Sequence, residues 1–193
     1  MRPTREQAYA LLKQYNKSEA LIKHALSVEG VMRHFAGLYA GSDTDLWGIV
    51  GLLHDLDYEQ YPDQHCKKTA EILNELGYDD VIVRGCASHG WGICSDIEPI
   101  SDMEKVLFTI DELTGLITAT AIMRPSKSVM DLELKSVKKK YKDRRFAAGV
   151  DRELVEKGAQ MIDMPLDDVI VHVILGMRDV ADEIGLRGNT ETE

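Results

Sequence analysis

The sequence lacks three features that would each place it in a particular class of protein. Its three cysteines, Cys66, Cys86 and Cys94, include no close pair of the zinc-finger kind, and their odd number predicts a reduced protein in the cytoplasm. No apolar run approaches the roughly 20 residues needed to span a bilayer. A net positive charge is absent, since 33 Asp and Glu outweigh 23 Lys and Arg to give a net charge of −10. This balance argues against nucleic-acid polymers and membranes as partners.

The composition and periodicity indicate one helical domain. Hydrophobic residues make up 44% of the 193 residues and charged residues 29%, which is typical of a globular chain of single-domain size. The only β-branched run, 169–174, keeps helical spacing around it. We therefore expect a single all-α domain over residues 1–187, in the form of a helical bundle, followed by a frayed tail at 188–193.

Nine segments carry apolar residues at helical spacing. Thr4 with Gln7 and Ser101 with Glu104 fit capping boxes, and Ser18 fits an N-cap. The predicted helices cover about 4–15, 18–40, 44–57, 64–76, 80–88, 101 to at least 117, 126–141, 151–163 and 166–184.

The most informative feature is a His-Asp pair at the end of an apolar run. His54 and Asp55 follow residues 46–53, in which Gly48 and Gly51 would weaken a helix and so indicate a close helix-helix approach. A buried imidazole and a buried charge cost several kcal/mol unless a partner satisfies them, about as much as a lost ion pair. A divalent metal would satisfy both residues.

Two further residues lie on or beside apolar stripes. His24 comes three residues after Leu21, and Asp111 comes four residues after Leu107. Each of these alone is more often a satisfied core residue than a ligand. Taken with His54 and Asp55, they favour a metal site over purely structural packing, because neutral imidazoles and ionised carboxylates from separate elements suit a divalent ion.

The order His24, His54-Asp55, Asp111 resembles the HD superfamily of metal-dependent phosphohydrolases, over a core of about 18–118. This resemblance implies a helical bundle of the HD type in which these four residues coordinate one metal ion. Asp55 would also orient the attacking water.

Two more histidines raise the question of a second ion. His65 and His89 resemble the additional histidines of the binuclear branch of the superfamily, in which Asp55 would bridge two metals. Alternatively, His65 and His89 hydrogen-bond a substrate phosphate or cap their helices. With Asp55, the catalytic candidates are His54 and His89, which would supply ligands and a proton for the leaving group.

The chain departs from the familial motif directly after the pair. Binuclear relatives often read His-Asp-Ile-Gly-Lys, whereas here Leu56, Asp57 and Tyr58 follow. No lysine stands beside the pair to hold a phosphate. Asp57 is either a carboxylate that supports the ligands or a turn residue at the end of its helix.

A basic segment offers a place for an anionic group. Residues 124–145 contain nine Lys or Arg against three acidic residues. Much of this charge fits a solvated helix face. Arg124 and Lys127 flank Pro125-Ser126, which reads as a helix start, and a helix N-terminus with flanking cations is a natural phosphate site. We expect Arg124 and Lys127 as candidate phosphate-binding or substrate-binding residues.

Other histidines and the cysteines are given structural roles. His34 lies about 80° around the helix from His24, and His172 sits inside an apolar run. Neither is expected to be a ligand. The cysteines read most simply as small core residues.

Taken with the family resemblance, these residues lead us to expect a phosphohydrolase that uses one or two divalent ions (Mn, Mg, Fe, Ni, Co or Zn). The resemblance implies that its substrate is a small anionic phosphomonoester or nucleotide. Two alternatives stay open: a non-catalytic binding or regulatory domain with a structural metal, and a di-iron oxygenase, since a branch of the HD superfamily performs that chemistry.

Overall fold

The computed structural model describes residues 1–188, and helices are the regular secondary structure of this part of the chain. No strand occurs in it beyond one isolated bridge between Trp91 and Ser95. The predicted all-α fold is therefore confirmed there, and the predicted tail lies, apart from Gly188, outside the described residues. The α-helices are α1 (Arg5–Tyr15), α2 (Glu19–Ala36), α3 (Thr44–Leu53), α4 (Lys67–Glu75), α5 (Asp80–Ser88), α6 (Asp102–Ile122), α7 (Leu134–Lys142), α8 (Arg152–Met161) and α9 (Leu166–Asp179), with a short 3₁₀ helix at Pro62–Gln64.

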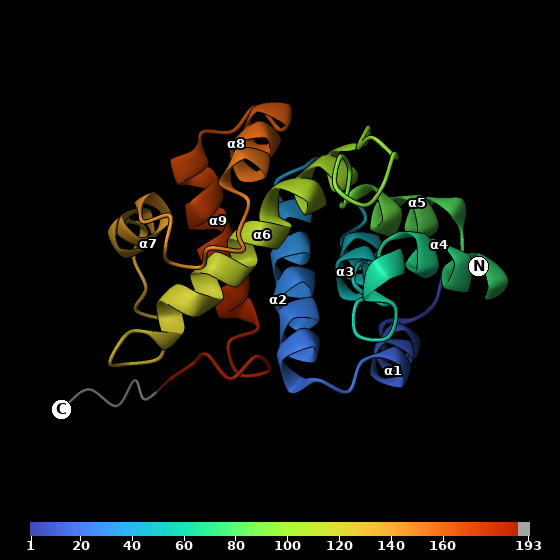
Figure 1. Ribbon diagram of the computed structural model, residues 1–193, viewed down its shortest axis with the longest axis horizontal. Coiled ribbons are helices and arrows are strands. Elements are labelled where there is room, and N and C mark those ends of the chain that lie inside the picture. The colour runs from blue at the N-terminus through green and yellow to red at the C-terminus, as the bar shows by residue number, and fades with distance from the viewer. Residues whose placement is uncertain (189–193) are drawn as a thin grey trace.

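Helix α2 is the centre of the arrangement. It packs against α3, α6 and α9, and Figure 1 shows α6 crossing in front of it. Helices α1, α3, α4 and α5 lie on one side of α2, and α7, α8 and α9 lie on the other (Figure 1). No helix in residues 1–188 has both the length and the apolar character needed to cross a membrane.

Side-chain caps fix where several helices begin. Both predicted capping boxes are present, with Thr4 at the start of α1 and Ser101 at the start of α6. Ser18 occupies the N-cap position of α2, but its side chain makes no capping hydrogen bond. The Glu59 carboxylate instead accepts hydrogen bonds from the backbone N–H groups of Lys17 and Ser18, at 2.6 and 2.9 Å. A residue distant in sequence therefore caps this helix.

Four predicted helix boundaries are wrong by several residues. Helix α9 ends at Asp179 rather than near residue 184, and turns follow it. Helix α2 ends at Ala36 rather than near residue 40, because i→i+3 hydrogen bonds tighten the chain from Gly37 onward. Helix α3 ends at Leu53, and residues 54–60 form turns. The basic helix α7 begins at Leu134, so the predicted start near residue 126 is absent.

Small residues allow the helices near the site to approach closely, as predicted for α3. A Cβ atom at Gly51 would lie 2.9 Å from Met32 Cγ and 3.1 Å from Val28 O on α2. On the opposite side of α2, a Cβ atom at Gly176 of α9 would lie 2.6 Å from Val31 Cα. Helix α2 therefore packs closely against α3 on one side and α9 on the other. This packing fixes the position of His24, which α2 carries.

Candidate metal centre

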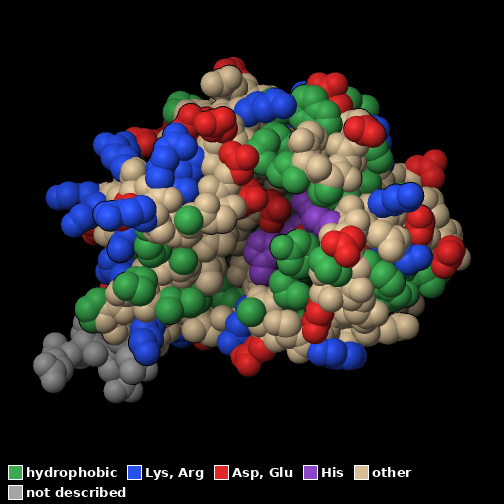
Figure 2. Space-filling model, viewed as in Figure 1, with side chains coloured by type: hydrophobic (Ala, Val, Ile, Leu, Met, Phe, Trp, Pro, Cys, Tyr) green, Lys and Arg blue, Asp and Glu red, His purple; other side chains and the backbone are tan. Residues whose placement is uncertain are grey.

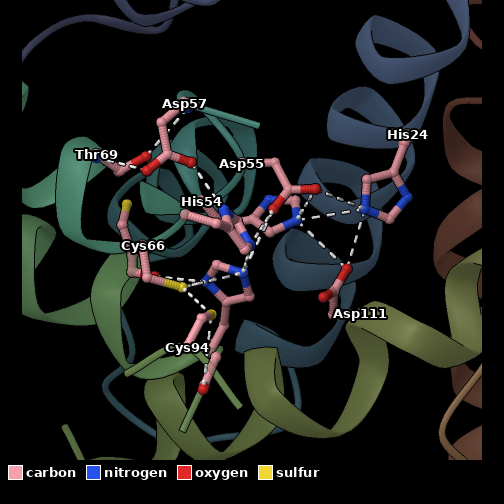
Figure 3. A network of polar contacts seen from close by, with 12 residues as sticks. His24, His54, Asp55, Asp57, Cys66, Thr69, Cys94 and Asp111 are labelled. Atoms are coloured by element: carbon pink, nitrogen blue, oxygen red, sulfur yellow. Dashed lines mark hydrogen bonds and ion pairs between the residues drawn. The ribbon is translucent and has the colours of Figure 1, made fainter. Parts of the chain in front are cut away.

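Four of the predicted ligands meet where α2, α6 and the end of α3 come together. We call His24, His54, Asp55 and Asp111 the first ligand group. His24 Nε2 lies 3.0 Å from Asp111 Oδ1 and 3.3 Å from His54 Nε2. His54 Nε2 lies 3.3 Å from Asp111 Oδ1 and 3.4 Å from Asp55 Oδ2 (Figure 3). Neighbouring ligand atoms around an octahedral divalent ion are about 3 Å apart, so this group could hold one ion.

The other carboxylate oxygen of Asp55 faces a second set of nitrogens. Oδ1 lies 3.4 Å from Nε2 of His65 and 3.4 Å from Nε2 of His89. These two nitrogens are 3.2 Å apart. We call His65, His89 and Asp55 the second ligand group. The two groups share Asp55, with one oxygen turned to each, which is the arrangement of a carboxylate that bridges two ions.

Hydrogen bonds on the far side of the rings decide which nitrogen faces the centre. His54 Nδ1 donates to Gly51 O at 2.7 Å, and His89 Nδ1 donates to Cys86 O at 2.6 Å. A carbonyl oxygen can only accept, so Nδ1 carries the hydrogen and Nε2 of the neutral ring presents a lone pair. These lone pairs point at carboxylate oxygens and at other ring nitrogens. Such a cluster of acceptors repels itself unless a cation or protons lie between them.

Asp57 orients His65 and does not belong to either ligand group. Its side chain is fully buried. Oδ1 accepts a hydrogen bond from His65 Nδ1 at 2.7 Å, and Oδ2 accepts one from the backbone N–H of Thr69 at 2.7 Å. Of the two roles left open by the sequence, the contacts favour support of a ligand. His65 itself precedes α4 by two residues rather than opening it, and Asp57 sets its direction.

Replacing Asp57 with asparagine is expected to weaken binding at the second ligand group selectively. An amide has one acceptor oxygen, so it can satisfy either His65 or Thr69 but must turn a donor toward the other. Loss of such a supporting partner costs about 10–100-fold in metal affinity. Titration with Mn²⁺ should show one weakened site and one unchanged site. Equal affinities in the variant and the parent protein would contradict this role for Asp57.

The imidazoles and carboxylates of this cluster also shift one another's pKa values. Burial by itself lowers the pKa of His54, but the carboxylates of Asp55 and Asp111 outweigh burial and raise that pKa well above its usual value. Burial by itself raises the pKa of Asp55 and Asp111, yet the facing imidazoles hold both pKa values well below the usual range. Both carboxyl groups are therefore ionised at neutral pH, as metal ligands must be.

A cavity of about 380 Å³ opens directly above the two ligand groups. Figure 2 shows histidine side chains at the floor of this hollow, with acidic side chains beside them. Asp55, Asp111 and Glu112 contribute carboxylates to the lining. No Lys or Arg of the described chain lines this cavity. The remaining wall is largely apolar and includes Ile93, Phe108, Val150 and Leu154.

Arg124 and Lys127 lie outside this cavity, and the helix start expected between them is wrong. Arg124 pairs with Asp131 at 2.7 Å, and the Ser126 hydroxyl donates to the same carboxylate, which closes a loop where a helix was expected. Lys127 has a positive φ of 48°. It lines a neighbouring cavity, which shares only His24 and Gly115 with the cavity above the ligand groups.

Two histidines set aside from the sequence lie apart from the centre. His34 Nε2 and His172 Nδ1 are 3.1 Å apart, between α2 and α9. Burial, followed by the neighbouring His172, lowers the pKa of His34. Neither residue belongs to a cluster of three or more ligand atoms in the described chain.

The interpretation of the cysteines as core residues is wrong for Cys94. Cys66 and Cys86 are buried, whereas Cys94 is exposed and lines the cavity. Its sulfur lies 3.1 Å from that of Cys66, and the Cys66 sulfur lies 3.8 Å from Nε2 of His89. The hydrogen bond from Cys66 lowers the pKa of Cys94 to about 6. The sequence contains a signal for this pair, because Cys66 follows His65 by one residue and Cys94 follows His89 by five.

Comparison with known proteins adds no relative to these observations. A scan against protein-family models, a search of curated proteins and a search of solved structures each found no match. The chemistry of the centre is therefore argued from its own residues.

Proposed function

We propose that this protein is a metal-dependent phosphohydrolase that acts on a small phosphomonoester or nucleotide. The observation that carries the proposal is the position of Asp55, which turns one oxygen to each ligand group on the floor of an open cavity. The resemblance of His24, His54-Asp55 and Asp111 to the HD superfamily points to the same reaction and to an HD-type bundle. An open cavity above the ligands favours catalysis over a closed structural metal site.

The residues present suit one or two divalent ions. When bound, such ions lower the pKa of coordinated water toward about 7 and neutralise charge on phosphoryl oxygens. His24, His54 and Asp111 would hold one ion, His65 and His89 the other, and Asp55 would bridge them. Asp55 would also orient the water, and Asp57 would fix the ring of His65. The roles of His54 and His89 would be those of ligands, because their Nδ1 hydrogens are committed to backbone carbonyls.

The lining of the cavity narrows the class of substrate. With three carboxylates and no Lys or Arg of the described chain in the wall, nothing but the ions would attract a phosphate. The apolar side chains Phe108, Val150 and Leu154 offer contact to an uncharged group. A monoester with one phosphate and a compact apolar or planar remainder fits these walls better than a polyphosphate does.

A phosphatase screen on metal-loaded protein tests the proposal. Nucleoside monophosphates and sugar phosphates should release phosphate in a Mn²⁺-dependent reaction. The matching nucleoside triphosphates should have a kcat/KM about tenfold or more lower, because their extra charges would face the carboxylates of the wall. Failure of a protein that holds two ions to hydrolyse any ester would contradict the proposed reaction.

A second candidate function is favoured by that same lack of cations in the wall. An oxygenase with a di-iron centre needs six ligands, and the two groups supply His24, His54, Asp55, His65, His89 and Asp111. Such an enzyme needs no cation for a phosphate. Anaerobic purification with iron analysis and spectroscopy for coupled iron separates the two functions: coupled iron favours the oxygenase, and full phosphatase activity with Mn²⁺ or Mg²⁺ favours the hydrolase.

A further inference from the structure

Two thiols lie next to the second ligand group in space and are close to its histidines in the sequence. Cys66 is the residue directly after His65, and Cys94 belongs to the loop that follows His89. Their sulfur atoms are 3.1 Å apart and face each other in Figure 3. Neither thiol has a role in the proposed hydrolysis.

The backbone holds both thiols over Gly90. A Cβ atom at this position would lie 2.5 Å from the Cys66 sulfur and would also collide with the Cys94 sulfur. The loop after Gly90 is closed by its own hydrogen bonds, in which the backbone N–H groups of Cys94 and Ser95 donate to Gly90 O at 3.0 and 3.1 Å. Cys66 has a φ of 65°, which non-glycine residues rarely adopt. The meeting of the two sulfurs is thus built into the local fold.

The two thiols differ in access to solvent. Cys94 is exposed and lines the cavity, whereas Cys66 is only 1% exposed. The third thiol, Cys86, is fully buried and faces Val50 O at 3.6 Å. A small oxidant entering the cavity therefore meets Cys94 first and finds Cys66 directly behind it.

We propose that Cys66 and Cys94 are an oxidisable dithiol that hydrogen peroxide converts to a disulfide, and that this disulfide disables the second ligand group. The Cys94 sulfur attacks the peroxide, whose O–O bond breaks, giving a sulfenic acid and one water. The Cys66 sulfur then attacks the sulfenic sulfur, the S–S bond forms, and the departing hydroxide takes the Cys66 proton as a second water. Two electrons pass from the sulfur pair to the peroxide.

We expect disulfide formation to disturb the second ligand group because the two sulfurs and the two histidines are close along the chain. A disulfide bond is about 2.05 Å long, so the two sulfurs must approach by about 1 Å from their present 3.1 Å. Cys66 is bonded to His65, and Gly90, which lies against both sulfurs, is bonded to His89. Metal-ligand distances tolerate only about 0.2 Å of change. This half of the inference rests on the metal centre of the proposed function.

The test uses the full chain loaded with Mn²⁺, an ion with little preference for thiolates. After treatment with one equivalent of hydrogen peroxide, two of the three thiols should be lost, and peptide mapping without reductant should show Cys66 linked to Cys94. The protein should lose one of its two Mn²⁺ equivalents, and a dithiol reductant should restore both thiols and metal. An unlinked pair, or a linked pair with both ions retained, would overturn the inference.

Cysteine variants show whether the loss of an ion after peroxide treatment is due to the disulfide or to another effect. Cys94→Ser should keep both ions before and after peroxide, and Cys86→Ala should behave as the parent protein does. Loss of an ion from reduced Cys94→Ser would show that this thiol is a ligand, which contradicts the inference. A reduced parent protein that binds no Mn²⁺ would contradict the proposed function instead, and the peptide map would still decide whether the dithiol forms.

Discussion

Replacing Asp55 with alanine is expected to remove both metal ions in one step. Asp55 is the only residue whose two oxygens reach both ligand groups in the described chain, at 3.4 Å from His54 on one side and from His65 and His89 on the other. Phosphatase activity should fall by more than the roughly 10²–10³-fold that removal of one electrostatic stabiliser costs. The variant should remain helical, because the apolar core does not depend on this side chain.

Elemental analysis of the purified variant provides the measurement. Asp63→Ala is the matched control, since Asp63 is exposed and lies in neither ligand group, and it should keep both ions. Full hydrolysis by Asp55→Ala protein from which metal has been removed would contradict the proposed chemistry.

The second large expected effect is that two variants, one in each ligand group, each lose one of the two metal ions. Asp111→Ala removes a carboxylate that only the first ligand group uses, and His89→Ala removes an imidazole that only the second group uses. Each variant is expected to keep one Mn²⁺ equivalent and to lose most of the activity. Electron paramagnetic resonance should show a coupled Mn²⁺ pair in the parent protein and an isolated ion in each variant.

A matched control exists for the histidine variant. His34→Gln alters an imidazole that contacts His172 rather than the centre, and it should leave the metal content and the coupled signal unchanged. Loss of both ions from Asp111→Ala and from His89→Ala alike would show that the two ligand groups are not separate. Loss of metal from His34→Gln would show that the ligands are misidentified.

The sequence was sufficient to predict the ligand residues whose positions follow from the local spacing of apolar residues. His24 and Asp111 follow the apolar stripes of α2 and α6, and those stripes must face the core for the helices to pack. His54 and Asp55 follow a run that is buried almost throughout. The all-α fold and both capping boxes follow from the same short-range rules. The structure brings together all six residues that were predicted as ligands.

What the sequence could not predict depends on contacts between distant residues. Glu59 caps α2 from across a turn, and Asp57 reaches both His65 and Thr69. The segment after Arg124 reads as a helix start, but Asp131 binds both Arg124 and Ser126 and holds a loop there. Cys94 has an apolar character that fits a core, and only the fold of the loop after His89 brings it to the cavity.

The most direct test of the metal centre is anomalous diffraction from crystals grown with Mn²⁺. Two peaks are expected, one on either side of the Asp55 carboxylate, the first bound by His24, His54 and Asp111 and the second by His65 and His89. A single ion bound away from Asp55, or crystals in which these side chains bind no metal at saturating Mn²⁺, would contradict the assignment of this cluster as a metal centre.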